Sequence, residues 1–112
     1  KYLDIRLSKL KQLNIPKRKK KLREVFQFYC FLAKNRNRLK KFLNKKGIDA
    51  KIHYPIPMHM QKPSSKFGYR RGMFKMSENI SKKIISLPVH EFVKKSDLDY
   101  MINSIYKFYS YT

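Results

Sequence analysis

Cysteine and glycine are both scarce in this sequence. The 112 residues contain a single cysteine, Cys30, and three glycines. One cysteine excludes an internal disulfide and a four-cysteine metal site. Cys30 lies within an alternating apolar run, so we expect it to act as a small buried hydrophobe rather than as a nucleophile. The chain also contains no glycine-rich phosphate loop.

Long hydrophobic stretches are absent as well. No apolar run approaches the length that spans a bilayer, and the start of the chain does not resemble a signal peptide. We therefore expect a cytoplasmic protein without a membrane partner, which the low cysteine content also favours. The chain starts at Lys1 rather than at a methionine, so we expect a fragment, a processed product or a shortened form. Hydrophobic residues still make up 42% of it, which predicts one domain with a modest core.

Acidic residues are few. Seven aspartates and glutamates face 28 lysines and arginines, which gives a formal net charge of +21. Such a charge suggests nucleic acid or an anionic membrane as a partner. However, lysine predominates over arginine, whose planar fork suits phosphate and guanine better, and the lysines are spread over every segment. We therefore expect no specific nucleic-acid partner and keep a small basic nucleic-acid-binding module as the alternative. The same charge would also attract an anionic ligand or an acidic partner domain.

The first third of the chain predicts a helix, a basic loop and a strand. Leucines at helical spacing indicate a helix from Tyr2 to about Leu13, which ends at residues 14–16. The basic run 17–23 matches a nuclear-localisation or phosphate-binding pattern. However, short basic runs of this kind are more often solvated connecting loops. Residues 25–32 are aromatic and branched, as strands prefer. Both alternating sets of this strand are largely apolar, so we expect it to be covered on both faces or central in its sheet.

A second helix and a second strand follow. Asn35 or Asn37 is a suitable N-cap for a helix that runs to Lys46. Gly47 ends this helix, because glycine readily adopts a positive φ. Residues 48–53 alternate between apolar and polar side chains, which predicts a short strand. Its residues expected to point to the core are Ile48, Ala50 and Ile52.

The second half of the chain predicts two more helices. Residues 67–76 suggest a loop with two glycines, and Ser77 is expected to cap a short helix over residues 78–86. Residues 87–88, Leu-Pro, are expected to break regular structure. A final helix follows the capping box at residues 96–99. Its apolar stripe is expected to consist of Leu98, Met101, Ile102, Ile105 and Tyr109. Strand, helix and strand at this spacing predict an α+β layer with helices on one face.

The segment 47–63 is the best candidate for ligand contacts. Its three prolines hold it stiff without a regular hydrogen-bond ladder, and it presents His53, Tyr54, His59 and Gln61. Loops with such side chains often bind ligands. Equally often they are structural loops whose histidines are hydrogen-bonded within the protein. The three histidines of the chain do not show a specific metal-ligand spacing, so no metal site is predicted.

The order of these features resembles one family closely. The strand 25–32, the segment 35–39 (NRNRL) and above all residues 47–61 (GIDAKIHYPIPMHMQ) are similar to the C-terminal part of the DegT/DnrJ/EryC1/StrS family. This is a family of PLP-dependent sugar-nucleotide aminotransferases. Residues 72–78 (GMFKMSE) and 85–88 (ISLP) match its later motifs. The stretch from IHYP to the glutamine is the specific part, and the resemblance covers nearly the whole chain.

The resemblance implies the C-terminal small domain of the aspartate-aminotransferase fold, a small antiparallel or mixed sheet with helices packed on one face. It divides the chain into the end of a linker helix (1–16), a basic loop (17–24) and the small domain (25–112). It also implies an intact enzyme that is a homodimer. Pyridoxal 5′-phosphate would be its cofactor and would be bound mainly by an N-terminal large domain.

The resemblance further implies transfer of an amino group, with glutamate as the donor, onto a keto sugar attached to a nucleotide. Such products serve cell-surface polysaccharide or amino-sugar biosynthesis. The Schiff-base lysine and the acid that pairs with the pyridine nitrogen would lie in the large domain, so this chain is expected to hold no catalytic residue and to be inactive alone. Its role would be substrate capture. His53 and Tyr54 would donate to the diphosphate or the sugar hydroxyls, and His59 and Gln61 would support the loop or touch the sugar.

Overall fold

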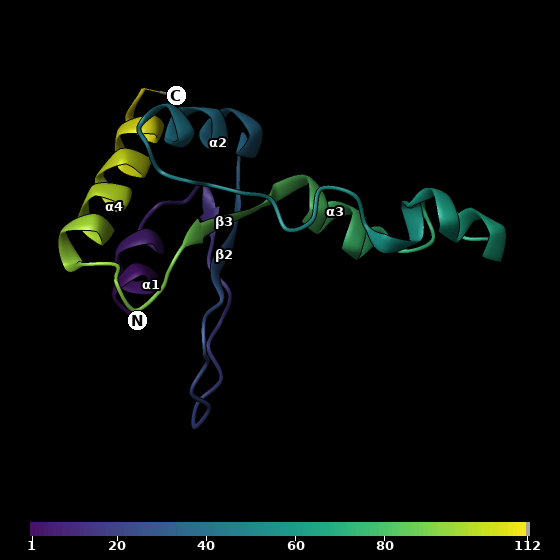
Figure 1. Ribbon diagram of the computed structural model, residues 1–112, viewed down its shortest axis with the longest axis horizontal. Coiled ribbons are helices and arrows are strands. Elements are labelled where there is room, and N and C mark those ends of the chain that lie inside the picture. The colour runs from purple at the N-terminus through teal and green to yellow at the C-terminus, as the bar shows by residue number, and fades with distance from the viewer. Residues whose placement is uncertain (112) are drawn as a thin grey trace.

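The computed structural model describes residues 1–111 of the chain (Figure 1). Its elements, in chain order, are the helix α1 (Tyr2–Leu7), the strands β1 (Leu13–Asn14) and β2 (Phe28–Ala33), the helix α2 (Arg36–Lys45), the 3-10 helices η1 (Met58–Met60) and η2 (Lys62–Phe67), the helix α3 (Lys75–Lys83), the strand β3 (Ile84–Pro88) and the helix α4 (Lys95–Ser110). Within the described residues, no helix combines the length and the apolar character needed to cross a bilayer.

The three strands form one antiparallel sheet in the order β1-β2-β3. Alternate residues of the central strand, Tyr29, Phe31 and Ala33, are buried, whereas the residues between them are partly or fully exposed. This alternation is typical of a sheet with one face against a core. Of the expected antiparallel or mixed sheet, the structure has the antiparallel form. Of the two explanations for the apolar strand, covered on both faces or central in its sheet, the central position is confirmed.

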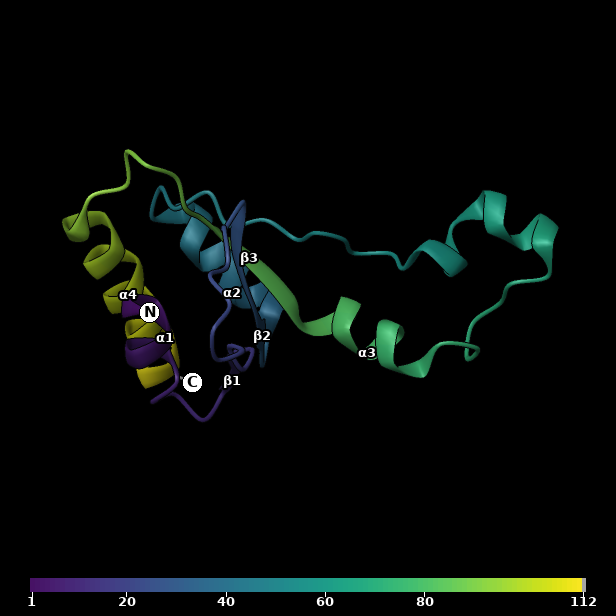
Figure 2. The same cartoon turned by 90° about the horizontal axis from the view of Figure 1, so that it is seen from below.

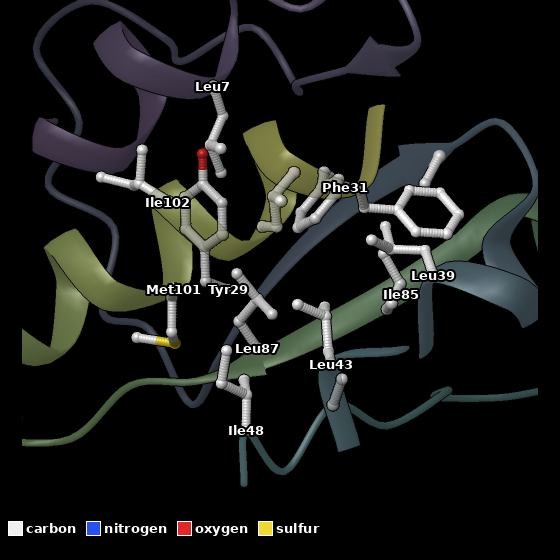
Figure 3. Packing of buried hydrophobic residues seen from close by; sticks show 14 of the residues in the cluster. Leu7, Tyr29, Phe31, Leu39, Leu43, Ile48, Ile85, Leu87, Met101 and Ile102 are labelled. Atoms are coloured by element: carbon white, nitrogen blue, oxygen red, sulfur yellow. The ribbon is translucent and has the colours of Figure 1, made fainter. Parts of the chain in front are cut away.

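A single hydrophobic core lies between one face of the sheet and the helices α1, α2 and α4 (Figure 3). Leu7 of α1, Leu39 and Leu43 of α2, and Ile102 and Ile105 of α4 are completely buried there. Leu39 and Leu43 are four positions apart and the two isoleucines are three apart, so each helix directs one apolar stripe at the sheet. The predicted α+β layering, with helices on one face, is therefore confirmed.

Two segments project from this body (Figures 1 and 2). One comprises residues 17–27. The other, called the arm from here on, comprises residues 52–77 with η1, η2 and the start of α3, and none of its residues is buried. The radius of gyration is 15.6 Å, compared with about 13 Å for a compact domain of this length. The projecting segments account for this larger radius. Because none of its residues is buried, the arm has no core of its own.

The first helix is shorter than its leucine spacing predicts. α1 ends at Leu7, so the prediction of a helix to about Leu13 is wrong. Leu13 instead pairs with Ala33 in the sheet, and this pairing requires an extended backbone, which the turns of residues 8–12 allow. The strand predicted over residues 25–32 begins only at Phe28, where its pairing with β3 starts.

The strand predicted over residues 48–53 is reduced to a single bridge between Lys51 and Ser86. Ile48 and Ala50 are nevertheless buried, as their alternation predicts. Ile52, also expected to point to the core, is only partly buried. The stop signal before them is also confirmed, because Gly47 has a φ of +76° directly after α2.

The segment after the arm differs most from the sequence-based prediction. α3 begins at Lys75, so Ser77 lies inside the helix and does not cap it. The helix predicted over residues 78–86 ends at Lys83, because residues 84–88 pair with β2 instead. Leu87 and Pro88 therefore belong to a strand and do not break regular structure. Proline is tolerated at this position because β3 is an edge strand.

Candidate functional site

A cleft of about 230 Å³ opens where the arm leaves the body. The segment 53–61 forms one wall, and residues of α3 and the first residue of β3 form the other. His53, Tyr54 and Gln61 line this cleft. The structure thus brings together three of the four residues expected to bind a ligand.

His53 lies on the sheet face that points away from the core. Its Nδ1 atom is 3.0 Å from the hydroxyl oxygen of Ser86 on β3. The imidazole stacks on the ring of Phe28 from β2, with ring centroids 4.1 Å apart, and the ring of Tyr54 meets its edge at 5.7 Å. One hydrogen bond and two ring contacts therefore hold the imidazole in one orientation at the wall of the cleft.

Tyr54 and Gln61 lie at the open side of the cleft. The side chain of Tyr54 is 73% exposed, and Gln61 is also exposed. Between them, Pro57 has φ and ψ values of −58° and 148°, which are those of an extended, proline-rich chain. The prolines thus present a phenol and an amide to solvent beside the imidazole, which gives the cleft several hydrogen-bonding groups.

His59 does not line the cleft. Its Nε2 atom is 3.0 Å from the carboxylate of Glu78 on α3, which also accepts a 2.7 Å hydrogen bond from the backbone N–H of Gly72. The ring of Phe74 packs against the imidazole at 4.9 Å. These contacts connect η1 to α3.

Glu78 lies within the family-like segment 72–78, but its pairing with His59 could not be predicted from the sequence. The hydrogen bond with His59, followed by the one from Gly72, lowers the pKa of its carboxyl group below the usual value. The carboxylate therefore stays charged near neutral pH. No local signal indicates this pair, because 19 positions separate the two residues.

Positive charge surrounds the arm. Its far part carries Lys62, Lys66, Arg70 and Arg71, and no acidic residue occurs between Asp49 and Glu78. Because the single carboxylate at the end of this stretch is already paired with His59, the field over the arm is positive. Such a field concentrates anionic ligands near the cleft.

The cleft does not fit pyridoxal 5′-phosphate by itself. Covalent attachment of that cofactor requires a lysine amine, and its ring nitrogen requires an acidic partner. Neither lysine nor an acidic residue lines the cleft, and the nearby carboxylate of Glu78 is engaged by two hydrogen bonds. Residues 1–111 also contain no group of three side chains placed to hold a metal ion. The polar groups that line the cleft are an imidazole, a phenol, an amide and two serine hydroxyls.

Comparison with known proteins gives a consistent result. The model of the DegT/DnrJ/EryC1/StrS aminotransferase family matches residues 1–106. The chain is 33% identical over 85 residues to the "pleiotropic regulatory protein" of Geobacillus stearothermophilus, which covers 76% of this chain and 23% of the relative. It is 26% identical over 84 residues to dTDP-3-amino-3,6-dideoxy-alpha-D-galactopyranose transaminase of Aneurinibacillus thermoaerophilus, which covers 75% of this chain and 23% of that enzyme.

The fold is shared with solved aminotransferases. The crystal structure of a DegT DnrJ EryC1 StrS aminotransferase from Brucella abortus superposes with a TM-score of 0.86 and 27% identity, over 96% of this chain and 28% of that structure. The chain thus spans about a quarter of the length of the relatives that it matches. The aspartate-aminotransferase-like fold expected from the sequence is confirmed.

Proposed function

Because the chain belongs to the DegT/DnrJ/EryC1/StrS aminotransferase family, we propose that it is the C-terminal, substrate-binding part of an enzyme that aminates nucleotide-linked keto sugars. Aminotransferases of this family depend on pyridoxal 5′-phosphate, and one relative is named as a transaminase of a dTDP-linked sugar. Glutamate is the proposed amino donor, and the product would serve cell-surface polysaccharide or amino-sugar synthesis. The residues that hold the cofactor lie outside this chain in our proposal.

The observation that carries the proposal is the cleft at the base of the arm. It combines an oriented imidazole, a phenol and an amide within a positively charged surface. Diphosphates and sugar hydroxyls are recognised by donors of this kind, and hydrogen bonds to charged groups are the stronger ones. His53 and Tyr54 are the proposed donors to the diphosphate or to sugar hydroxyls, with Gln61 at the sugar. His59 is the proposed support of the loop.

The arm supports the second part of the proposal, a large domain and a second subunit as partners. Phe67 is 78% exposed and Met76 is 74% exposed, so within residues 1–111 no other segment covers either side chain. Apolar side chains gathered on a projecting segment usually mark an interaction surface. Since the relatives are about four times as long as the matched segment, additional protein is available to cover this surface. The homodimer is proposed on the same grounds.

The substrate-binding role is tested in the intact enzyme by calorimetric titration with dTDP. His53→Ala removes one proposed donor to the diphosphate, so the dissociation constant should rise by roughly tenfold, as expected for one hydrogen bond to a charged group. His90→Ala is the matched control, because His90 is an exposed imidazole that does not line this cleft. Equal affinity of the wild type and both variants would refute the role of His53.

The reaction itself is tested by amino transfer between glutamate and a dTDP-linked keto sugar. The intact enzyme should convert the sugar, and the 112-residue chain supplied alone should not, because its cleft lacks a lysine for the cofactor. Conversion by the chain alone would contradict the division of roles proposed here.

A further inference from the structure

Three side chains form a linear hydrogen-bonded chain behind the cleft. The Sγ atom of Cys30 on β2 lies 3.3 Å from the Oγ atom of Ser86 on β3. The same Oγ atom lies 3.0 Å from Nδ1 of His53. Ser86 is only 1% exposed, so its hydroxyl has no access to bulk water and these two side chains are its partners.

The backbone fixes the position of this serine. Its N–H donates to the carbonyl of Lys51 at 2.9 Å, and its own carbonyl accepts from the N–H of Lys51 at 3.0 Å. Ser86 also pairs with Cys30 in the sheet register. The serine is therefore held between the central strand and the segment that leads to His53, and its hydroxyl is a rigid reference point for the imidazole.

The second nitrogen of His53 points to the open side. Within residues 1–111, no hydrogen bond engages Nε2, whereas every buried side-chain nitrogen or oxygen has a partner. An unpartnered Nε2 must therefore reach solvent, and His53 lines the cleft. A flip of the ring about its Cβ–Cγ bond would keep the stack on Phe28 but would break the contact between Nδ1 and the hydroxyl of Ser86.

The chemistry of the three groups favours one position for the proton of a neutral imidazole. A serine hydroxyl has one hydrogen, and a thioether or thiol sulfur is a weak acceptor. Of the two arrangements that a neutral imidazole allows, the favoured one has the hydroxyl donating to Nδ1 and accepting the S–H of Cys30, because the reverse would direct the hydroxyl hydrogen at the weak sulfur acceptor. A neutral imidazole whose Nδ1 accepts must carry its hydrogen on Nε2, because only one of the two nitrogens is protonated.

We propose that Ser86, itself oriented by Cys30, is a positioning residue that keeps the hydrogen of His53 on Nε2 and so presents an N–H donor to an anionic oxygen in the cleft. The nature of that oxygen, a diphosphate or sugar oxygen, rests on the proposed function, whereas the tautomer of His53 does not. An acceptor at Nε2 would repel such an oxygen, so the tautomer determines whether the cleft binds or rejects it.

The tautomer is measured by ¹⁵N NMR of the intact protein labelled at histidine, with His53 assigned by its loss in His53→Gln. Neutral wild-type protein should show a protonated Nε2 and an unprotonated Nδ1 at His53. The opposite pattern in the wild type would overturn the proposal without any variant of Ser86. Ser86→Ala should give a mixture of both tautomers, and Ser86→Thr, which keeps the hydroxyl, should restore the wild-type pattern. An unchanged tautomer in a folded Ser86→Ala protein would also overturn it.

Ser104→Ala is the matched control, since Ser104 is also buried but lies on α4 in the core. It should leave the His53 signals unchanged.

Titration with dTDP separates the two proposals. Ser86→Ala should weaken binding by severalfold if His53 contacts the diphosphate. Unaltered binding in both His53→Gln and Ser86→Ala, together with the expected tautomer, would refute the substrate role and leave the positioning role standing.

Discussion

At the scale of single residues, Asp4 joins three segments of the body. Its carboxylate accepts hydrogen bonds from the guanidinium of Arg18 at 2.9 and 3.2 Å and from the hydroxyl of Tyr29 at 2.7 Å. Arg18 also forms a 2.7 Å ion pair with Glu24 and lies over the ring of Phe26. This cluster anchors the projecting residues 17–27 to α1 and β2.

Replacing Asp4 should therefore destabilise the fold. Asp4→Asn removes the charge that the guanidinium and the phenol surround, and we expect the free energy of unfolding to fall by roughly 1–3 kcal/mol. Asp49→Asn is the matched control, because the Asp49 carboxylate pairs with Lys51 on the surface and is 66% exposed. That change should stay within about 0.5 kcal/mol. Urea denaturation at pH 7 measures both, and equal effects would contradict the role of the cluster.

The same carboxylate predicts a dependence on pH. Burial raises the pKa of Asp4, but the hydrogen bonds from Arg18 and Tyr29 and the attraction of Arg18 outweigh it, so the pKa is lowered overall. A lowered pKa stabilises the fold fully above the ordinary aspartate value of about 3.9 and progressively less as the pH falls through the value in the folded protein. The stability difference between wild type and Asp4→Asn should be constant near neutral pH and shrink in acid. A difference that widens in acid would refute this assignment.

The residue scale also shows what the sequence can predict of the site. The grouping of His53, Tyr54 and Gln61 could be predicted from the sequence alone, because they are close together in the chain and the prolines between them keep the segment extended beside the cleft. Ser86, the partner of His53, could not be found in this way. It lies 33 positions away, and only the pairing of β2 with β3 brings it behind the imidazole.

At the scale of elements, Gly47 ends α2 with a left-handed backbone. An ideal Cβ at this position would meet no atom within 4 Å, so a side chain would be disfavoured by its φ of +76° alone. Gly47→Ala should therefore cost about 1–2 kcal/mol. Gly47→Asn should recover part of this loss, because asparagine tolerates the left-handed region. Thermal unfolding of the two variants measures the difference, and equal melting temperatures would contradict the explanation.

Helix α4 offers a second test, of packing. Ile102 is completely buried in the core, so Ile102→Ala should lower the free energy of unfolding by about 2–5 kcal/mol. The neighbouring Asn103 is exposed on the same helix, and Asn103→Ala should change stability by no more than about 0.5 kcal/mol. Chemical denaturation compares the two. A comparable loss in both variants would contradict the role of Ile102 in core packing.

Elements with a strong local signal could be predicted, and elements defined by distant partners could not. α4 follows its apolar stripe and α2 ends at its glycine, since both signals lie within the element. α1, in contrast, ends early because Leu13 is required for pairing with β2. β3 contains a proline and continues directly from a helix, and it is a strand only because β2 lies beside it.

At the scale of the whole molecule, the charge of +21 concerns association rather than fold. Basic residues occur on α2, on the arm and in the residues 17–27, and so are not confined to one element. This distribution favours a general attraction for polyanions over sequence-specific binding. An experiment can distinguish this general attraction from the alternative, a dedicated nucleic-acid-binding module.

The charge predicts weak, salt-sensitive binding to DNA without sequence preference. If about six phosphates are neutralised, affinity for a short duplex should fall by roughly a thousandfold between 50 and 200 mM salt. Two duplexes of unrelated sequence should bind equally well throughout, as measured by fluorescence anisotropy. A preference for one sequence that persists at physiological salt would favour the nucleic-acid-binding module.

The arm also has a consequence for the life of the protein in a cell. A segment whose Phe67 and Met76 remain in water is a natural substrate for chaperones and a preferred site for proteases until another surface shields it. In the proposed enzyme, a second subunit would shield this segment. Copies of that enzyme that have not yet assembled should therefore be degraded sooner than assembled ones.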